Sequence, residues 1–281
     1  MNTLRDVAEG VRRLAVTRSR LADDLRRLGP QAGGIAMVHT RMSALGWVVG
    51  GSETVVRALL DVLGPEGTVA AYASWDDHVY HDEERPAEHL HAYLAEPPVF
   101  DPATGEADRG HGRIPERLRT WPGAERSAQP DASVVAVGAR ARWLTHPHAP
   151  DHGYGAGTPF ARLVEAGGQV LLLGAPLDTI TLLHHAEAIA DVPGKRFVTY
   201  RLAVAEGGRT EQRTYTDIDT GRGALPYADL GLDDDEFAVI ARAALAAGIG
   251  ARGVVGQAEC HLFPAPELTA FAVRWLEERF A

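Results

Sequence analysis

The chain has 281 residues, of which 45% are hydrophobic, and a formal net charge of -10. This size and composition are typical of a globular protein with one large core or two modest ones. The acidic balance argues against a nucleic-acid partner, and the absence of a long apolar run argues against a membrane span. A single cysteine excludes an internal disulfide and, with no secretory signal in the first residues, favours a cytoplasmic protein.

The first half of the chain alternates helical and strand patterns. Residues 1–16 are predicted to be an N-terminal extension, and residues 17–281 a single domain. Residues 76–112 carry little periodicity, and a segment of that length in a compact domain is usually functional or mobile. Helices are predicted over residues 17–28, 52–63 and 113–119, and strands over residues 35–39, 68–72 and 134–137.

The second half continues this alternation, which indicates an α/β fold built on one main sheet. Two of its strands, over residues 196–205 and 213–219, are predicted to pair with each other. The other strands are predicted over residues 170–173 and 253–263, and helices over residues 159–165, 233–247 and 267–280.

The most informative segment follows the predicted strand over residues 170–173. A Gly/Pro turn ends that strand, and Asp178 or Thr179 then offers an N-cap for a helix. On that helix His184 and Glu187 lie three residues apart and share a face. Because open α/β sheets bind ligands at the carboxyl ends of their strands, this pair is placed to take a proton from a substrate. We interpret Glu187 as the group that orients His184 and raises its basicity.

Other kinds of catalytic site find little support. The sequence has no Gly-x-Ser-x-Gly nucleophile elbow and no convincing phosphate-binding Gly-rich loop. Cys260 lies in an apolar run and is predicted to be a buried thiol. His146, His148 and His152 form a loose cluster, but their spacing lacks a firm third metal ligand. A metal-dependent hydrolase stays open as an alternative, which the zinc content of the purified protein would test.

Several short motifs along the chain form a specific set. They are Met37-Val-His39-Thr40, Tyr72-Ala-Ser74-Trp75-Asp76, Phe100-Asp-Pro-Ala-Thr104, Leu171-Leu-Leu-Gly174-Ala-Pro and Thr181-Leu-Leu-His184-His-Ala-Glu187. In this order, over about residues 17 to 281, the chain resembles the aminoglycoside 3-N-acetyltransferase family, which is unrelated in fold to the common acetyltransferase superfamily. The resemblance implies a single α/β domain with a central mixed β-sheet flanked by helices.

The resemblance also implies an acetyltransferase that confers antibiotic resistance. Its donor would be acetyl-CoA, its acceptor the 3-amino group of the 2-deoxystreptamine ring of an aminoglycoside, and no metal would take part. His184 matches the catalytic base of the family, Glu187 lies near that base, and His152 belongs to the active site. The residues expected to contact the acceptor are Trp75, Asp76, Asp77, Asp217 and Asp219.

Coenzyme A is expected to bind a loop rich in small residues and a second segment further along the chain. Backbone N–H groups between Thr40 and Ser43 could hold its phosphates or the oxyanion of the reaction. The side chains of Arg41 and Arg126 could pair with the phosphates. The residues expected to bind coenzyme A are Thr40, Arg41, Ser43, Gly50, Gly51, Arg126, Ser127 and Ser133.

The chemistry of this reaction agrees with these residue types. An aminoglycoside amine is mostly protonated at neutral pH and cannot attack a thioester in that state. A carboxylate-rich pocket would bind the polycation, and a neutral histidine would accept the proton of the reacting amine. Because the sequence offers no plausible nucleophile, the amine is expected to attack acetyl-CoA directly, without an acyl-enzyme.

One position departs from the family pattern. The family signature Arg-Ser-x-His-Pro reads Arg126-Ser-Ala-Gln129-Pro here, and a glutamine can form hydrogen bonds but cannot titrate. We expect Gln129 to serve coenzyme binding or loop structure, with catalysis retained.

Two other functions stay open from the sequence. The acceptor could be the amine of another metabolite, or the protein could bind an antibiotic without turnover, which thiol release from acetyl-CoA would reject. Neither the preferred drug nor the oligomeric state follows from the sequence, and a homodimer is one candidate.

Overall fold

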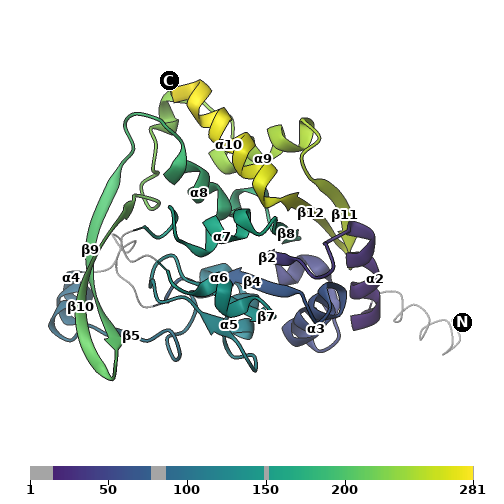
Figure 1. Cartoon of the computed structure of the whole chain (residues 1–281), viewed down its shortest axis with the longest axis horizontal. Coiled ribbons are helices and arrows are strands. Elements are labelled where there is room, and N and C mark those ends of the chain that lie inside the picture. Colours follow the sequence, from purple (N-terminus) through teal and green to yellow (C-terminus); the bar gives the residue numbers. More distant parts are fainter. Residues whose placement is uncertain (1–14, 77–86, 149–151, 281) are drawn as a thin grey trace, which may run out of the picture.

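Seven strands form the main sheet, which lies between two layers of helices in this computed structural model (Figure 1). The structure describes residues 15–76, 87–148 and 152–280. In spatial order the strands are β11 (Ala251–Val255), β12 (Ala258–Pro264), β8 (Gln169–Leu173), β2 (Ile35–Thr40), β4 (Thr68–Tyr72), β7 (Val134–Gly138) and β6 (Glu125–Arg126).

The direction of the strands makes the sheet mixed. Strand β2 runs parallel to both of its neighbours, β8 and β4, whereas β12 is antiparallel to β8 and β7 is antiparallel to β4. The predicted architecture, a central mixed sheet flanked by helices, is therefore confirmed. Because β8, β2 and β4 point the same way, their carboxyl ends meet at one edge of the sheet, where open α/β sheets bind ligands.

Alternate side chains of the strands enter two separate cores. In β8, Val170 and Leu172 pack on one side and Leu171 and Leu173 on the other, and all four are 0% exposed. A strand that is buried on both faces needs a continuous apolar run, which is the pattern seen there. The first core includes α6 (Ala141–Thr145), α7 (Pro159–Glu165), α8 (Leu182–Ile189), α9 (Glu236–Ala246) and α10 (Ala265–Phe280), and the second includes α2 (Arg18–Leu28), α3 (Gly51–Leu63) and α5 (Arg113–Arg119).

The single strand predicted over residues 253–263 is instead a hairpin. Strands β11 and β12 pair antiparallel, and the chain turns between them at Gly256, whose φ is +64°. A Cβ atom at Gly256 would lie 2.6 Å from the carbonyl oxygen of Leu45, so this close approach requires glycine.

Helix α8 begins later than predicted. A 3₁₀ turn, η3 (Leu177–Thr179), takes up the residues that were expected to cap the helix, and α8 starts at Leu182 after Thr181. The shift leaves His184 and Glu187 on the helix, so the face that they share is retained.

Two small sheets complete the described chain. Strands β9 (Phe197–Glu206) and β10 (Arg209–Ile218) form the predicted pair, the long green hairpin at one side of Figure 1, and β5 (Val99–Phe100) joins β9. Strand β1 (Ala15–Val16) pairs with β3 (Trp47–Val48), so the last two residues of the predicted extension belong to the folded domain.

The remaining helices include η1 (Met42–Leu45), α4 (Ala87–Ala95), η2 (Arg109–His111) and η4 (Tyr227–Leu230). None of the described helices is long and apolar enough to cross a membrane.

Candidate active site

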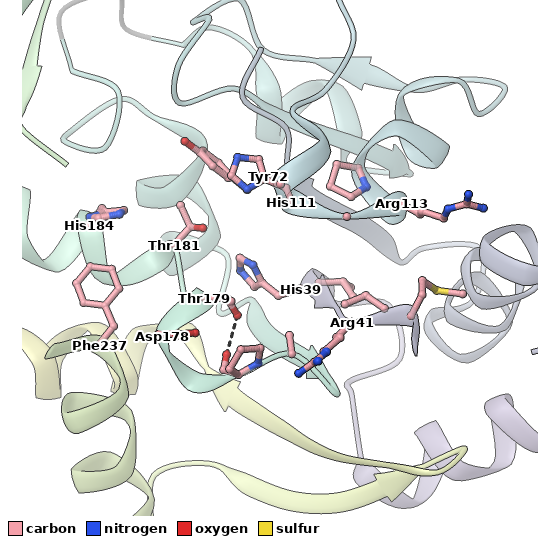
Figure 2. Close-up of a pocket in the computed structure, with 18 of the residues that line it drawn as sticks. His39, Arg41, Tyr72, His111, Arg113, Asp178, Thr179, Thr181, His184 and Phe237 are labelled. Atoms are coloured by element: carbon pink, nitrogen blue, oxygen red, sulfur yellow. Dashed lines mark hydrogen bonds between the residues drawn. The ribbon is translucent and has the colours of Figure 1, made fainter. Parts of the chain in front are cut away.

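A cleft with a volume of about 940 Å³ opens at the edge where β8, β2 and β4 end. Its walls come from the residues that follow these strands, from the segment before α5, and from α8 and α9. Figure 2 shows His184 and Phe237 on one side of the cleft, Arg41 and Arg113 on the other, and His39 between them. The cleft therefore connects an imidazole end to a guanidinium end.

The imidazole end is built by α8. His184 Nδ1 lies 2.7 Å from Glu187 Oε2, as expected for residues one helical turn apart. Glu187 is 2% exposed, and its other oxygen accepts a hydrogen bond of 2.6 Å from the Tyr227 hydroxyl. Burial and the Glu187 carboxylate raise the pKa of Tyr227 above its ordinary value, so this hydroxyl remains a donor. Both carboxylate oxygens are thus held in place.

His184 has one ring nitrogen left for a substrate. An ionised carboxylate only accepts hydrogen bonds, so in the neutral form of His184 the Nδ1 atom beside Glu187 carries the proton and Nε2 keeps its lone pair. The centroid of the His184 ring lies 5.0 Å from that of Tyr154 and 4.7 Å from that of Phe237. Its side chain is 22% exposed and lines the cleft. The arrangement orients the imidazole of His184 beside a buried carboxylate, as a general base requires.

The guanidinium end carries unpaired positive charge. Arg41 follows β2 and Arg113 begins α5, and both exposed side chains line the cleft. Neither side chain has an ion-pair partner within the described part of the chain. The whole chain carries a net charge of -10, so a local gathering of positive charge stands out from the rest of the protein. Two guanidinium groups without ion-pair partners in one cleft therefore indicate a site for an anion. Sequence reasoning missed Arg113, since it belongs to no recognisable motif.

Two further histidines line the cleft, and neither was among the predicted site residues. Burial and the neighbouring His111 lower the pKa of His39 to about 3, so His39 is neutral at physiological pH. The His111 ring lies 4.5 Å from the Tyr72 ring, and its Nε2 atom lies 2.6 Å from Ser74 Oγ. The place of His39 near the end of a predicted strand was a signal for function. His111 lies in a segment without periodicity, so the sequence gave no signal that it belongs to a functional site.

Comparison with known proteins identifies the family. The family model described as aminoglycoside 3-N-acetyltransferase matches residues 37–277. The chain belongs to the aminoglycoside 3-N-acetyltransferase family. Among its relatives, aminoglycoside N(3)-acetyltransferase VIII of Streptomyces fradiae is 53% identical over 94% of this chain and 93% of that protein.

Solved structures agree with this assignment. The chain shares 46% identity and a TM-score of 0.87 with AAC-IIIb in its binary complex with CoASH, over 95% of this chain and 98% of that one. It shares 38% identity and a TM-score of 0.86 with sisomicin-bound AAC-VIa, over 94% of this chain and 99% of that one. The family and the enzyme class predicted from the sequence, an acyltransferase, are confirmed.

The residues predicted to bind coenzyme A in this family member do not all share one place. Thr40 at the end of β2, Arg41 after it and Ser43 in η1 line the cleft. Gly50 and Gly51 lie at the start of α3, where both have positive φ angles of +83° and +62°. The first group faces the cleft directly, and the second lies outside its wall.

Arg126, Ser127 and Ser133 are buried in the interior instead. Arg126 is 6% exposed and donates hydrogen bonds to Ser133 Oγ at 3.1 Å and to the Ala73 carbonyl at 2.6 Å. Burial lowers its pKa to about 10, which leaves it cationic. Ser127 Oγ accepts a hydrogen bond of 2.9 Å from the Val134 N–H. The expectation that these residues hold coenzyme A is not supported, because their polar groups are used within the protein.

The residues predicted to contact the acceptor are dispersed as well. Trp75 is 3% exposed, and its ring centroid lies 5.5 Å from that of Phe100, so a drug contact for Trp75 is not supported. Asp76 is partly exposed and lies 3.3 Å from Arg109 Nε. Asp77 lies outside the described residues.

Asp217 anchors the loop that carries His152. Its carboxylate is 6% exposed and accepts hydrogen bonds from the N–H groups of Gly153 and Ile218. Burial raises the pKa of Asp217 to about 7. A buried carboxylate in this position does not support direct contact with a drug. Asp219 is 8% exposed and directly precedes Thr220 and Gly221, which line the cleft. His152 is exposed and is not among the residues that line the cleft.

Gln129, the departure from the family signature, has a structural position. It is 1% exposed, its amide nitrogen donates to the Tyr200 hydroxyl at 2.9 Å, and its amide oxygen accepts from the Ala132 N–H. Gln129 therefore links the loop before β7 to the hairpin strand β9. This geometry agrees with a role in loop structure, which a neutral amide fulfils as both donor and acceptor.

The predicted loose histidine cluster is divided by the fold. His148 is buried, with Nδ1 2.9 Å from Ser127 Oγ and Nε2 3.0 Å from the Gly153 carbonyl oxygen, so both ring nitrogens are used. Burial lowers its pKa to about 4. Across the residues that the structure describes, no group of three or more ligands could hold a metal ion.

Cys260 is 0% exposed, which confirms the prediction that its thiol is buried.

Proposed function

We propose that this chain transfers the acetyl group of acetyl-CoA to the 3-amino group of the 2-deoxystreptamine ring of an aminoglycoside, with His184 as the general base. The observation that carries the proposal is the His184–Glu187 pair at one end of a cleft whose other end presents free guanidinium groups. Two relatives support the choice of substrates, since AAC-IIIb binds CoASH and AAC-VIa binds sisomicin. Acetylation of the drug would confer resistance.

The guanidinium end sets the direction of the donor. The phosphates of coenzyme A pair with Arg41 and Arg113, and the pantetheine arm then carries the thioester toward His184. His39 lies between these two ends and is neutral, with a pKa of about 3. It therefore adds no positive charge that would repel a cationic acceptor.

Carboxylates near the imidazole end receive the acceptor. Asp178 lines the cleft, and burial together with Asp235 and Asp234 raises its pKa. Gathered like charges of this kind attract a polycation and increase its local concentration. Asp76 and Asp219 remain candidates from the sequence, because both lie close to the cleft wall.

After the ammonium form of the acceptor has lost one proton to solvent, the reaction transfers one acetyl group and moves one further proton. As the amine nitrogen attacks the thioester carbon, His184 Nε2 accepts a proton from that nitrogen, so no residue is acylated. The new N–C bond forms and the C–S bond breaks. The leaving thiolate then takes the proton from the imidazolium and departs as a thiol. Glu187 stabilises the imidazolium while it carries the proton.

A panel of aminoglycosides with acetyl-CoA, followed by release of free thiol, tests this proposal. We expect thiol release together with acetylation at the 3-amino group, and no reaction with an aminoglycoside that is already acetylated there. Drug binding without thiol release would contradict the proposal and favour sequestration. Thiol release with a different class of amine only would favour another metabolite as acceptor.

Two further predictions concern the protein in the cell. A homodimer is one candidate for its oligomeric state, which light scattering of the purified protein measures. A cytoplasmic location is expected, because acetyl-CoA is available there, and cell fractionation measures it.

A further inference from the structure

The middle of the cleft contains a histidine that takes no part in the proposed proton transfer. His39 lies near the end of β2 and lines the cleft between His184 on one side and Arg41 on the other (Figure 2). We propose that His39 is a further catalytic residue, whose ring N–H donates a hydrogen bond to the carbonyl oxygen of the thioester and stabilises the oxyanion that forms there. The inference rests on the proposed function, since it takes a thioester as the donor.

The alternation of side chains along β2 places His39 on the same side of the sheet as α8. Residues two apart in a strand share a face. Met37 belongs to the core that includes α8 and α9, whereas Val38 belongs to the core that includes α3 and α5. In the sheet register His39 lies beside Leu172 of β8, the strand that leads to α8. His39 therefore faces the layer of helices that carries the general base.

The imidazole of His39 has hydrogen-bonding capacity to spare. Its Nε2 atom is buried without a hydrogen-bond partner, and no described residue forms a hydrogen bond with its Nδ1 atom. The other two histidines of the cleft differ, because His184 Nδ1 pairs with Glu187 and His111 Nε2 pairs with Ser74. A buried polar group without a partner costs free energy and calls for a reason, of which a catalytic role is one. Because protein atoms enclose Nε2, Nδ1 is the ring nitrogen that can reach a ligand.

His39 is suited to donate a hydrogen bond in its neutral form. Burial and the neighbouring His111 lower its pKa to about 3, so the ring carries a single proton at physiological pH. An acceptor oxygen beside Nδ1 holds that proton on Nδ1, because the hydrogen bonds of the ring decide the tautomer. A neutral imidazole can polarise a carbonyl group. It also does not repel the ammonium groups of a cationic acceptor.

The hydrogen bond from His39 strengthens as the reaction proceeds. When the amine nitrogen forms its bond to the thioester carbon, one electron pair of the C=O bond moves to the oxygen, and Nδ1–H then faces a growing negative charge. The pair returns when the C–S bond breaks, so His39 keeps its proton throughout. One backbone alternative for this role is already used, since the Arg41 N–H donates to the Leu173 carbonyl oxygen at 3.1 Å.

His39→Leu and His39→Asn separate the hydrogen-bond donor from the volume of the side chain. The two replacements are nearly equal in size, and only asparagine has an N–H group, close to the place of Nδ1. We expect His39→Leu to lower the single-turnover rate of acetyl transfer about 100- to 1,000-fold, the scale of one lost oxyanion donor. His39→Asn should recover a large part of that loss. Calorimetry should show the same coenzyme A affinity for both variants, because coenzyme A lacks the thioester oxygen.

His261→Leu is the matched control. His261 is 7% exposed, its Nδ1 atom is also buried without a hydrogen-bond partner, and it lies on β12, away from the residues that line the cleft. Its replacement should leave the rate unchanged. The pH profile of His39→Asn should keep the wild-type midpoint, because His39 does not titrate near neutral pH. Thermal unfolding verifies that each variant is folded, and His39→Ala serves as the donor-free variant if His39→Leu does not fold.

A near-wild-type rate for the donor-free variant, or equal rates for it and His39→Asn, would overturn the inference. A shifted pH midpoint would do the same, since it would make His39 a base. Weaker coenzyme A binding at an unchanged rate would assign His39 to donor binding instead. These outcomes leave acetyl transfer by the wild type intact. Absence of thiol release by the wild type, with any aminoglycoside, contradicts the proposed function itself.

Discussion

Replacing Glu187 by glutamine tests whether the buried carboxylate assists His184 through its charge. The amide has the same size, and its oxygen can still accept the hydrogen bond from His184 Nδ1, which now spans 2.7 Å. The Tyr227 hydroxyl can rotate to accept a hydrogen bond from the new NH₂ group. What the substitution removes is the negative charge beside the imidazolium that forms when His184 accepts a proton.

The size of the effect follows from this contact. A hydrogen bond to a charged group contributes about 1.5–3 kcal/mol. Glu187 is 2% exposed, so solvent screens little of its charge. At about 1.36 kcal/mol for each factor of ten, kcat should fall about 10- to 150-fold. The KM of acetyl-CoA should change little, because Glu187 lies behind His184 and contacts no donor group in the proposed arrangement.

The assay is thiol release with both substrates varied, so that kcat and each KM are separated. Tyr227→Phe is the matched control, since it removes one hydrogen bond from the same carboxylate and leaves its charge; kcat should then fall less than about tenfold. A Glu187→Gln enzyme with wild-type kcat would refute the electrostatic role. A higher acetyl-CoA KM at unchanged kcat would show that Glu187 serves donor binding instead.

Four further results are expected. His184→Ala should lower kcat about 100- to 10,000-fold while calorimetry shows unchanged coenzyme A affinity, and near-normal turnover would remove His184 from the reaction. Gln129→His should change kcat less than about tenfold, or about 1.4 kcal/mol of barrier, because Gln129 contacts Tyr200 and not the cleft; a gain of several hundredfold would contradict this. Burial raises the pKa of Asp217 to about 7, so the folded state binds its proton more tightly than the unfolded state. The stability due to this group should therefore fall as the pH rises from about 4 to about 7, and Asp217→Asn should flatten that part of the Tm curve; parallel curves would contradict it. Aminoglycoside affinity measured by calorimetry should weaken with added salt if carboxylates such as Asp178 bind the drug, and salt-independent binding would argue against them.

The sequence by itself determined four strands of the main sheet, β2, β4, β7 and β8, and the contact between His184 and Glu187. The apolar run over residues 170–173 requires burial on both faces, and it forms β8 (Gln169–Leu173). The spacing of His184 and Glu187 places them on one helical face whatever the rest of the chain does, and they meet at 2.7 Å. Both results are local, because the periods of strands and helices follow from backbone geometry alone. The motifs that pointed to the family are likewise readable without a structure.

Only the tertiary structure decided which other side chains share the cleft. Phe237 of α9 packs beside the His184 ring, and Tyr227 holds the far side of the carboxylate, yet neither carries a sequence signal. Arg113, which no motif marks, joins Arg41 in one wall, whereas Arg126, predicted to bind phosphate, donates to backbone carbonyls in the interior. A guanidinium group pairs with whichever acceptors the fold brings near it. Contacts between distant segments of the chain, and not the residue type, therefore decide whether an arginine faces a ligand or supports a loop.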